Sequence, residues 1–109
     1  MPTDISESDR KAFLSKMHYL LSRTSSGSTI CPSQIPRSLH DTDPSRYPNW
    51  RDLMDPVRQI VWEQVNKGNV QVTQKGEIRS FDQRNDIKGP IRVKKGEHWN
   101  ESLIQSEDE

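Results

Sequence analysis

The sequence offers few side chains whose type and spacing could carry out a reaction. Cys31 is the single cysteine of the chain. It stands just before a predicted helix, where the helix dipole can lower the pKa of a thiol. A buried and inert cysteine is the commoner outcome, and we expect that role here. A lone cysteine also excludes an internal disulfide and a zinc site of the CxxC type.

Other catalytic and metal-binding patterns are missing from the sequence. The three histidines, His18, His40 and His98, have no ligand spacing among them. The aspartates between residues 41 and 55 have the spacing of helix caps and turns. No Gly-rich phosphate loop occurs. We therefore predict a protein that is not an enzyme and that needs no metal and no cofactor.

Charge is the strongest functional signal, although sixteen basic and sixteen acidic residues give a net charge of zero. Residues 1–66 are balanced, residues 67–95 hold eight basic against three acidic side chains, and residues 96–109 hold only acids. The cations of the middle segment that can meet phosphates are Lys75, Arg79, Arg84, Lys88, Arg92, Lys94 and Lys95. They predict weak, salt-sensitive binding of DNA or RNA. The alternative is a solvated hairpin with a solubilising tail.

Two further hypotheses concern these charges. The acidic segment could fold back on the basic one and compete with nucleic acid, so that deleting residues 97–109 tightens binding at low salt. Arg92 could instead be structural and pair with Asp52 or Asp55 at the edge of the core.

Hydrophobic spacing and caps predict the helices that position these cations. A first helix begins after Ser6, a good N-cap, and carries an apolar stripe within residues 13–21. A second, shorter helix is predicted over 33–40. Asp55-Pro56 begins the third helix, with proline at its first position, and Gly68 ends it.

The strands are shorter and lie mostly after the third helix. Thr29 and Ile30 favour a brief extended segment between the first two helices. Residues 69–74 alternate as a half-buried strand, Lys75-Gly76 is suited to a turn, and residues 78 and 91–93 mark further extended pieces. This order predicts an α+β winged helix-turn-helix, with three helices and a small antiparallel sheet as the wing.

In helix-turn-helix proteins the second helix of the motif enters the major groove of DNA, and here that helix is 56–67. Its outward positions are Gln59, Glu63, Asn66 and Lys67, with Arg58 at the edge. Gln and Asn can read adenine, but Glu63 repels phosphate. We include Arg58, Gln59 and Lys67 among the candidate nucleic-acid contacts, and we do not expect strong sequence-specific binding.

A protein-interaction adaptor is the alternative function. Many small winged helices dock other proteins, which is an argument by fold alone. Tyr47 and Trp62 are the candidate exposed anchors, and Trp62 lies at the margin of the apolar stripe of the third helix. Filling of the core is an equally open role for Trp62. For Trp50 we expect a place in the core.

Three stretches carry a family resemblance: "TICPSQIPRSL", "NWRDLMDPVRQIVWEQVNKGNVQVTQKG" and "KGPIRV". Together they resemble a small family catalogued as domain of unknown function 3253. The similar region runs from about residue 13 to 93. The resemblance implies a winged-helix fold and supplies no established activity.

Composition predicts the domain boundaries and the cellular location of the protein. We expect a flexible N-terminus over 1–5, a winged-helix domain over 6–95 and an acidic disordered tail over 96–109. The sequence shows no signal peptide and no apolar run as long as a membrane span. We therefore expect an intracellular monomer, cytoplasmic or nuclear, that is not bound to a membrane.

Overall fold

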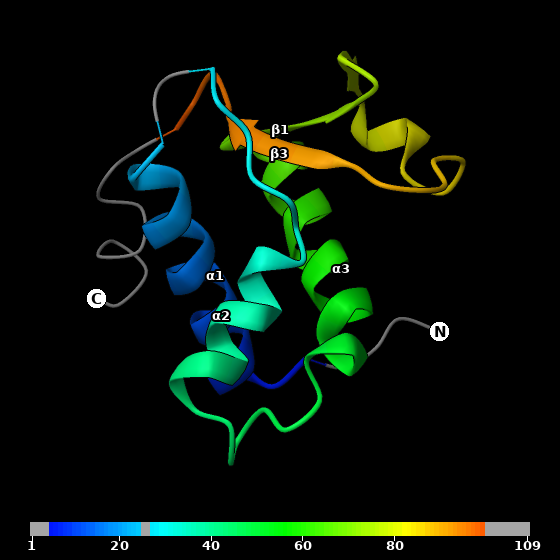
Figure 1. Cartoon of the computed structure of the whole chain (residues 1–109). Coiled ribbons are helices and arrows are strands. Elements are labelled where there is room, and N and C mark those ends of the chain that lie inside the picture. The colour runs from blue at the N-terminus through cyan, green and yellow to red at the C-terminus, as the bar shows by residue number, and fades with distance from the viewer. Residues whose placement is uncertain (1–4, 25–26, 100–109) are drawn as a thin grey trace.

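The structure is a computed structural model that describes residues 5–24 and 27–99 (Figure 1). The described elements, in chain order, are α1 (Glu7–Ser22), α2 (Gln34–Thr42), the 3-10 helix η1 (Trp50–Leu53), α3 (Met54–Asn66), β1 (Val70–Gln74), β2 (Glu77–Arg79), the 3-10 turn η2 (Phe81–Gln83) and β3 (Arg92–Lys95). Figure 1 shows the helices gathered on one side of β1 and β3. The predicted fold class is confirmed. It is an α+β arrangement of three helices and a small three-stranded antiparallel sheet, consistent with a winged helix.

The first two helices begin where their caps predict. The hydroxyl oxygen of Ser6 accepts a hydrogen bond from the backbone N–H of Asp9 at 3.1 Å, which satisfies one free donor of the first turn of α1. Ser33 precedes α2 without capping it through its side chain. Instead the Gln34 side chain accepts from the backbone N–H of Cys31 at 2.8 Å. Since α2 runs on to Thr42, it is longer than predicted.

The start of α3 differs from the prediction. Because η1 runs directly into it, α3 begins at Met54, and Pro56 is its third residue rather than its first. The missing N–H of proline costs nothing at either place, since the amides of a first helical turn have no partner within the helix. The proline therefore marks the first turn of a helix and does not fix its first residue. Gly68 follows the end of α3, as predicted.

The sheet has the order β2-β1-β3, with both pairs antiparallel. Lys75 (φ 54°) and Gly76 (φ 82°) both adopt left-handed backbone conformations and join β1 to β2, which confirms the predicted turn. The predicted segment before α2 reaches the sheet through Ile30, which forms an isolated bridge with Val93. The N–H of Ile30 donates to the Val93 carbonyl at 2.7 Å, and that of Val93 donates back at 2.8 Å.

The core lies between the helices and the inner face of the sheet. Val70, Val72 and Val93 supply the sheet side of this core. Buried side chains from the helices face them: Phe13, Leu14, Met17, Leu21, Ile35, Leu39, Val57, Ile60 and Val61. Burial of this kind stabilises the fold by about 1.5–3 kcal/mol for each large aliphatic side chain.

The chain after β3 stays against the domain as far as the structure describes it. The N–H of Gly96 donates to the Asn69 carbonyl, and that of His98 donates to the Gly68 carbonyl, both at 2.9 Å. A Cβ on Gly96 would lie 2.5 Å from the Gly68 oxygen, so only glycine permits this approach. Trp99 stacks on His18, with ring centroids 5.0 Å apart. Most of the predicted tail, residues 100–109, and residues 1–4 of the predicted N-terminus lie outside the described residues.

No helix within residues 5–24 and 27–99 has the length and apolar character needed to cross a membrane. In the same part of the chain, His, Cys, Asp and Glu side chains do not gather in any group that could hold a metal ion.

Candidate functional site

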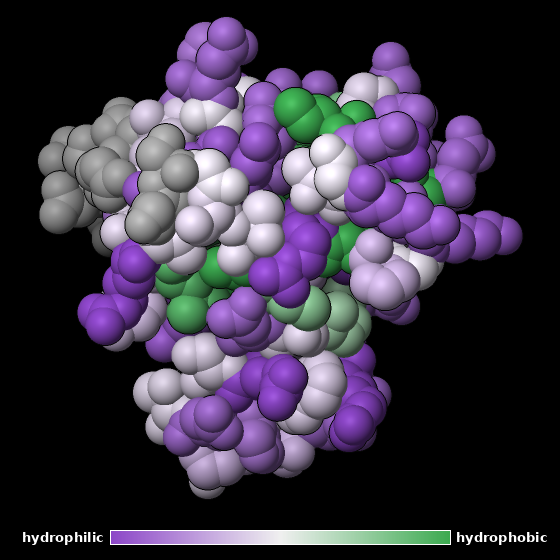
Figure 2. All heavy atoms as spheres, turned by 45° about the horizontal axis from the view of Figure 1, so that its top comes forward, coloured by the Kyte–Doolittle hydropathy of each residue, from purple (hydrophilic) through white to green (hydrophobic). Residues whose placement is uncertain are grey.

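Four of the predicted cations, Arg79, Arg92, Lys94 and Lys95, lie on strands and divide between the two faces of the sheet. Strand alternation turns Val70 and Val72 toward the core, so Gln71 and Thr73 lie on the opposite side, which we call the outer face. The strand register then places three neighbours of these residues on the same face: Ile78, Arg92 and Lys94. The outer face of the sheet, defined by these five residues, therefore carries two cations and no acid. Figure 2 shows a largely hydrophilic surface with small hydrophobic areas.

Arg92 is held on this face by a loop rather than by an acid. Its Nε donates to the hydroxyl oxygen of Thr29 at 3.0 Å, and a second nitrogen lies 3.4 Å from the Thr29 carbonyl. The predicted pairing with Asp52 or Asp55 is wrong. Arg92 bonds to Thr29 instead, because the bridge between Ile30 and Val93 places Thr29 next to Arg92. The guanidinium group of Arg92 is therefore oriented, and within residues 5–24 and 27–99 it forms no ion pair.

The other predicted cations have three kinds of environment. Arg79 pairs with Glu77 at 3.3 Å, and Lys95 points back to the Thr24 carbonyl at 3.4 Å. Arg84 lies over the ring of Phe81, 3.8 Å from its centroid, and donates to the Phe81 carbonyl at 2.9 Å. Of the seven cations predicted between residues 75 and 95, five make no ion pair with any described residue: Lys75, Arg84, Lys88, Arg92 and Lys94.

The predicted recognition surface of α3 is partly covered. The turn η2 packs against α3, and a hollow of about 410 Å³ lies beside this contact, between α3 and residues 81–85. This hollow, which we call the α3 groove, is lined by Arg58, Gln59, Trp62, Glu63, Phe81, Arg84 and Asn85. Lys67 lies exposed beyond the end of α3. The structure thus brings Arg58 and Gln59 together with Arg84 and leaves Lys67 apart from them.

Glu63 does not leave a free negative charge in the α3 groove. Its carboxylate forms an ion pair with Arg10 of α1, whose second terminal nitrogen lies 3.4 Å from the other carboxylate oxygen. The repulsion of phosphate expected from Glu63 is therefore reduced.

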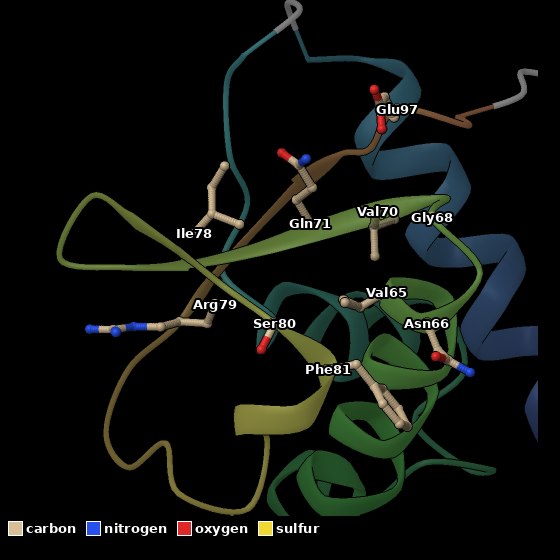
Figure 3. Close-up of a pocket in the computed structure, with 10 residues that line it drawn as sticks. All are labelled: Val65, Asn66, Gly68, Val70, Gln71, Ile78, Arg79, Ser80, Phe81 and Glu97. Carbon is tan, nitrogen blue, oxygen red and sulfur yellow. The ribbon is translucent and has the colours of Figure 1, made fainter.

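A second hollow of about 290 Å³ lies on the other side of Phe81, between the end of α3 and the sheet (Figure 3). Figure 3 shows Val65 and Val70 pointing toward each other across it, while Phe81 lies along α3 and Arg79 points away. Asn66, Gln71, Ser80 and Glu97 also line it. Its walls are therefore apolar and its edge is polar.

A family model described as "Protein of unknown function (DUF3253)" matches residues 10–96, from α1 to just past β3. The chain belongs to this family. The match confirms the resemblance drawn from the sequence, and it covers every helix and strand described above except the first three residues of α1. No curated protein matches the chain in sequence.

Of the aromatic residues singled out in this DUF3253 domain, Tyr47 and Trp50 lie where the sequence did not predict them, and Trp62 takes the core position that was one of its two open roles. Tyr47 and Trp62 are each only 6% exposed, so neither presents a ring to solvent as an anchor. Trp62 sits at the margin of the apolar stripe, and η2 packs against this side of α3, so that most of Trp62 is buried and the remainder borders the α3 groove. Tyr47 is buried with a carbonyl that contacts Nδ1 of His40 at 2.6 Å. Trp50 is half-buried outside the core, with the guanidinium carbons of Arg37 and Arg51 5.5 and 4.6 Å from its ring.

Cys31 is half-buried, so the expectation of a buried cysteine is wrong. Partial burial by itself raises the pKa of the thiol. The hydrogen bonds of Ser33, whose Oγ lies 3.1 Å from Sγ, and the charges of Arg92 and Arg37 outweigh it, and the net effect lowers the pKa below its ordinary value. The thiol is thus more ionised at neutral pH than in an unfolded chain.

Sequence reasoning missed Phe81 and Asn85, which help to form the α3 groove. A signal was present, because Ser80 and Gln83 have the spacing of a capping box. The structure contains that box, with the backbone N–H of Ser80 donating to Oε1 of Gln83 at 2.8 Å. The box begins the turn that carries Phe81 onto α3.

Proposed function

We propose that this protein is a non-catalytic winged-helix module that binds nucleic acid through the phosphate backbone. The observation that carries the proposal concerns the seven cations between residues 75 and 95, of which five have no ion pair among the described residues: Lys75, Arg84, Lys88, Arg92 and Lys94. Cations that only served the stability of the wing would be expected to pair with its acids, as Arg79 does with Glu77. Phosphates supply the missing counter-charges.

The expected binding is weak and depends on salt. Four phosphate contacts give a log–log salt slope of about −3.6 on duplex DNA, which weakens binding about a hundredfold between about 50 and 200 mM salt. Phosphate contacts carry no sequence information by themselves. The module is therefore expected to bind nucleic acids of many different sequences.

The setting we propose is an intracellular monomer, in the cytoplasm or the nucleus. A reduced single cysteine suits these compartments. Among the described residues the exposed large hydrophobic side chains are Tyr19 and Ile78, which lie on different elements. They do not form the contiguous apolar patch of an obligate dimer.

A charge-reversal experiment tests this function. Arg92→Glu combined with Lys94→Glu reverses the cations of the outer face and should abolish binding of a labelled oligonucleotide at low salt, measured by fluorescence anisotropy. The matched control is Lys16→Glu with Arg23→Glu, which makes the same change in net charge on α1 and at its C-terminal end, beside Tyr19. An equal loss with the control, or no binding by the parent protein at low salt, contradicts the proposal.

A protein adaptor is the second candidate. The observation in its favour is Ile78, which is 58% exposed on β2 at the edge of the sheet. Exposed edge strands can pair with a strand of another protein. β2 has only three residues, which limits this pairing, so we rank the adaptor below nucleic-acid binding.

A further inference from the structure

The packing of η2 against α3 determines which kind of nucleic acid can contact α3. A helix with its side chains is about 10–12 Å across. Such a helix nearly fills a major groove about 12 Å wide, so a recognition helix must protrude from its domain without another element packed beside it. Here η2 packs against α3, and Trp62 on the covered side is only 6% exposed. This arrangement obstructs the entry of α3 into a duplex.

The α3 groove that results has walls suited to a flat, polar ring. Arg84 lies over Phe81 at 3.8 Å, and a guanidinium held in this way is itself a platform on which a base can stack. Trp62 forms part of the wall. The volume of about 410 Å³ is within the range of pockets that bury small organic molecules.

The polar groups around the α3 groove match the edges of a base. Gln59 and Asn85 each carry an amide with both donor and acceptor groups, so they can pair with different bases. Arg58 lies on the same wall and can meet the adjoining phosphate. The Glu63 carboxylate is already engaged by Arg10.

We infer that the α3 groove accepts an unpaired base, and that the partner is therefore a single-stranded polynucleotide rather than a duplex. This inference rests on the proposed function and narrows it. The phosphates of the strand contact the cations of the wing, and one base turns out of the stacked strand and stacks on the guanidinium group of Arg84. Both RNA and single-stranded DNA offer this chemistry.

Comparison of matched strands tests the inference on the full chain. The probes are a labelled oligonucleotide of about 12 nucleotides and mixed sequence, as RNA and as DNA, and the duplex of the same sequence. The single strands should bind about five- to a hundredfold more tightly than the duplex, since stacking of one base is worth about 1–3 kcal/mol. Tighter binding of RNA than of DNA identifies RNA as the partner, and the reverse identifies DNA.

Arg84→Lys separates stacking from charge, because it keeps the positive charge and removes the planar group. Affinity for the single strand should fall at least about fivefold while affinity for the duplex stays unchanged. Lys88→Arg is the matched control on the same loop and should change neither. If the single strand and the duplex bind equally and Arg84→Lys changes nothing, the inference is overturned and the phosphate-binding function stands. If no nucleic acid binds at low salt, both fail.

Fluorescence of Trp62 gives a second readout. In a variant with Trp50→Phe and Trp99→Phe, Trp62 is the remaining tryptophan of the chain. A base in the α3 groove lies beside its indole and should quench the emission, whereas the duplex should not. Bound single strand without quenching overturns the inference.

Discussion

Cys31 shows how a single residue takes its chemistry from its neighbours. Partial burial raises the pKa of its thiol. The hydrogen bonds of Ser33 and the charges of Arg92 and Arg37 lower this pKa by a larger amount, so the net shift is downward. Because the folded pKa is depressed, the shift stabilises the folded chain above the ordinary thiol pKa. That contribution is lost as pH falls through the folded pKa.

The corresponding prediction concerns Ser33→Ala. Loss of the Ser33 hydroxyl should raise the pKa of Cys31 and slow its alkylation by iodoacetamide severalfold at neutral pH, because less thiolate is present. The measurement is the alkylation rate as a function of pH. Since the chain has one cysteine, the urea-unfolded protein supplies the reference profile. A variant that reacts as fast as the parent contradicts this account.

Residues at the margin of a helix stripe could not be placed from the sequence. Phe13 and Val61 sit in the middle of their stripes, and periodicity was enough to predict their burial. Trp62 lies at a margin, where burial depends on whether another element covers it. Trp50 stacks with Arg37 and Arg51 rather than entering the core, and no periodic pattern encodes such a contact.

At the scale of elements, the junction between α3 and β1 depends on one buried polar pair. The side-chain amide of Asn69 donates to Oε1 of Gln64 at 2.7 Å, and Gln64 is only 1% exposed. The backbone N–H of Asn69 also donates to the Gln64 carbonyl at 3.0 Å. A buried donor that loses its partner keeps its full desolvation cost.

We therefore predict that Gln64→Leu lowers the free energy of unfolding by about 1–3 kcal/mol, because it leaves the Asn69 amide unpaired. Urea denaturation measures the change. Gln59→Leu is the matched control, since Gln59 is half-buried on the same helix and its side chain makes no hydrogen bond with a described residue. It should change stability by no more than about 0.5 kcal/mol. Equal effects of both substitutions would show that the pair is not the cause.

Element order and class were predictable because caps and breakers are local signals. Ser6, Gly68 and the Lys75-Gly76 turn act through their own backbone neighbours. The start of α3 was less certain, since proline fits anywhere in a first helical turn. The α3 groove was not predicted, because it forms where η2 meets α3, and those segments are separated by the whole of β1 and β2.

At the scale of the whole molecule, zero net charge conceals a strong separation. Five wing cations make no ion pair with the described residues, while the last ten residues, 100–109, contain four acids and no base. Charges joined by a short chain reach each other easily, since ten extended residues span up to about 35 Å. Charge alone therefore supports competition between the C-terminal acids and a polyanion for the same cations.

Removal of residues 100–109 tests this competition and leaves Trp99 in place against His18. The truncated protein keeps all sixteen basic residues and loses four of its sixteen acids, so it should bind single-stranded oligonucleotide more tightly at about 50 mM salt. The gain should shrink at about 200 mM, because the Debye length falls below about 8 Å. Substitution of the four acids by Gln or Asn, at unchanged length, should reproduce the gain. If only the truncation tightens binding, the segment acts by bulk and not by charge, and unchanged affinity in both variants removes the competition altogether.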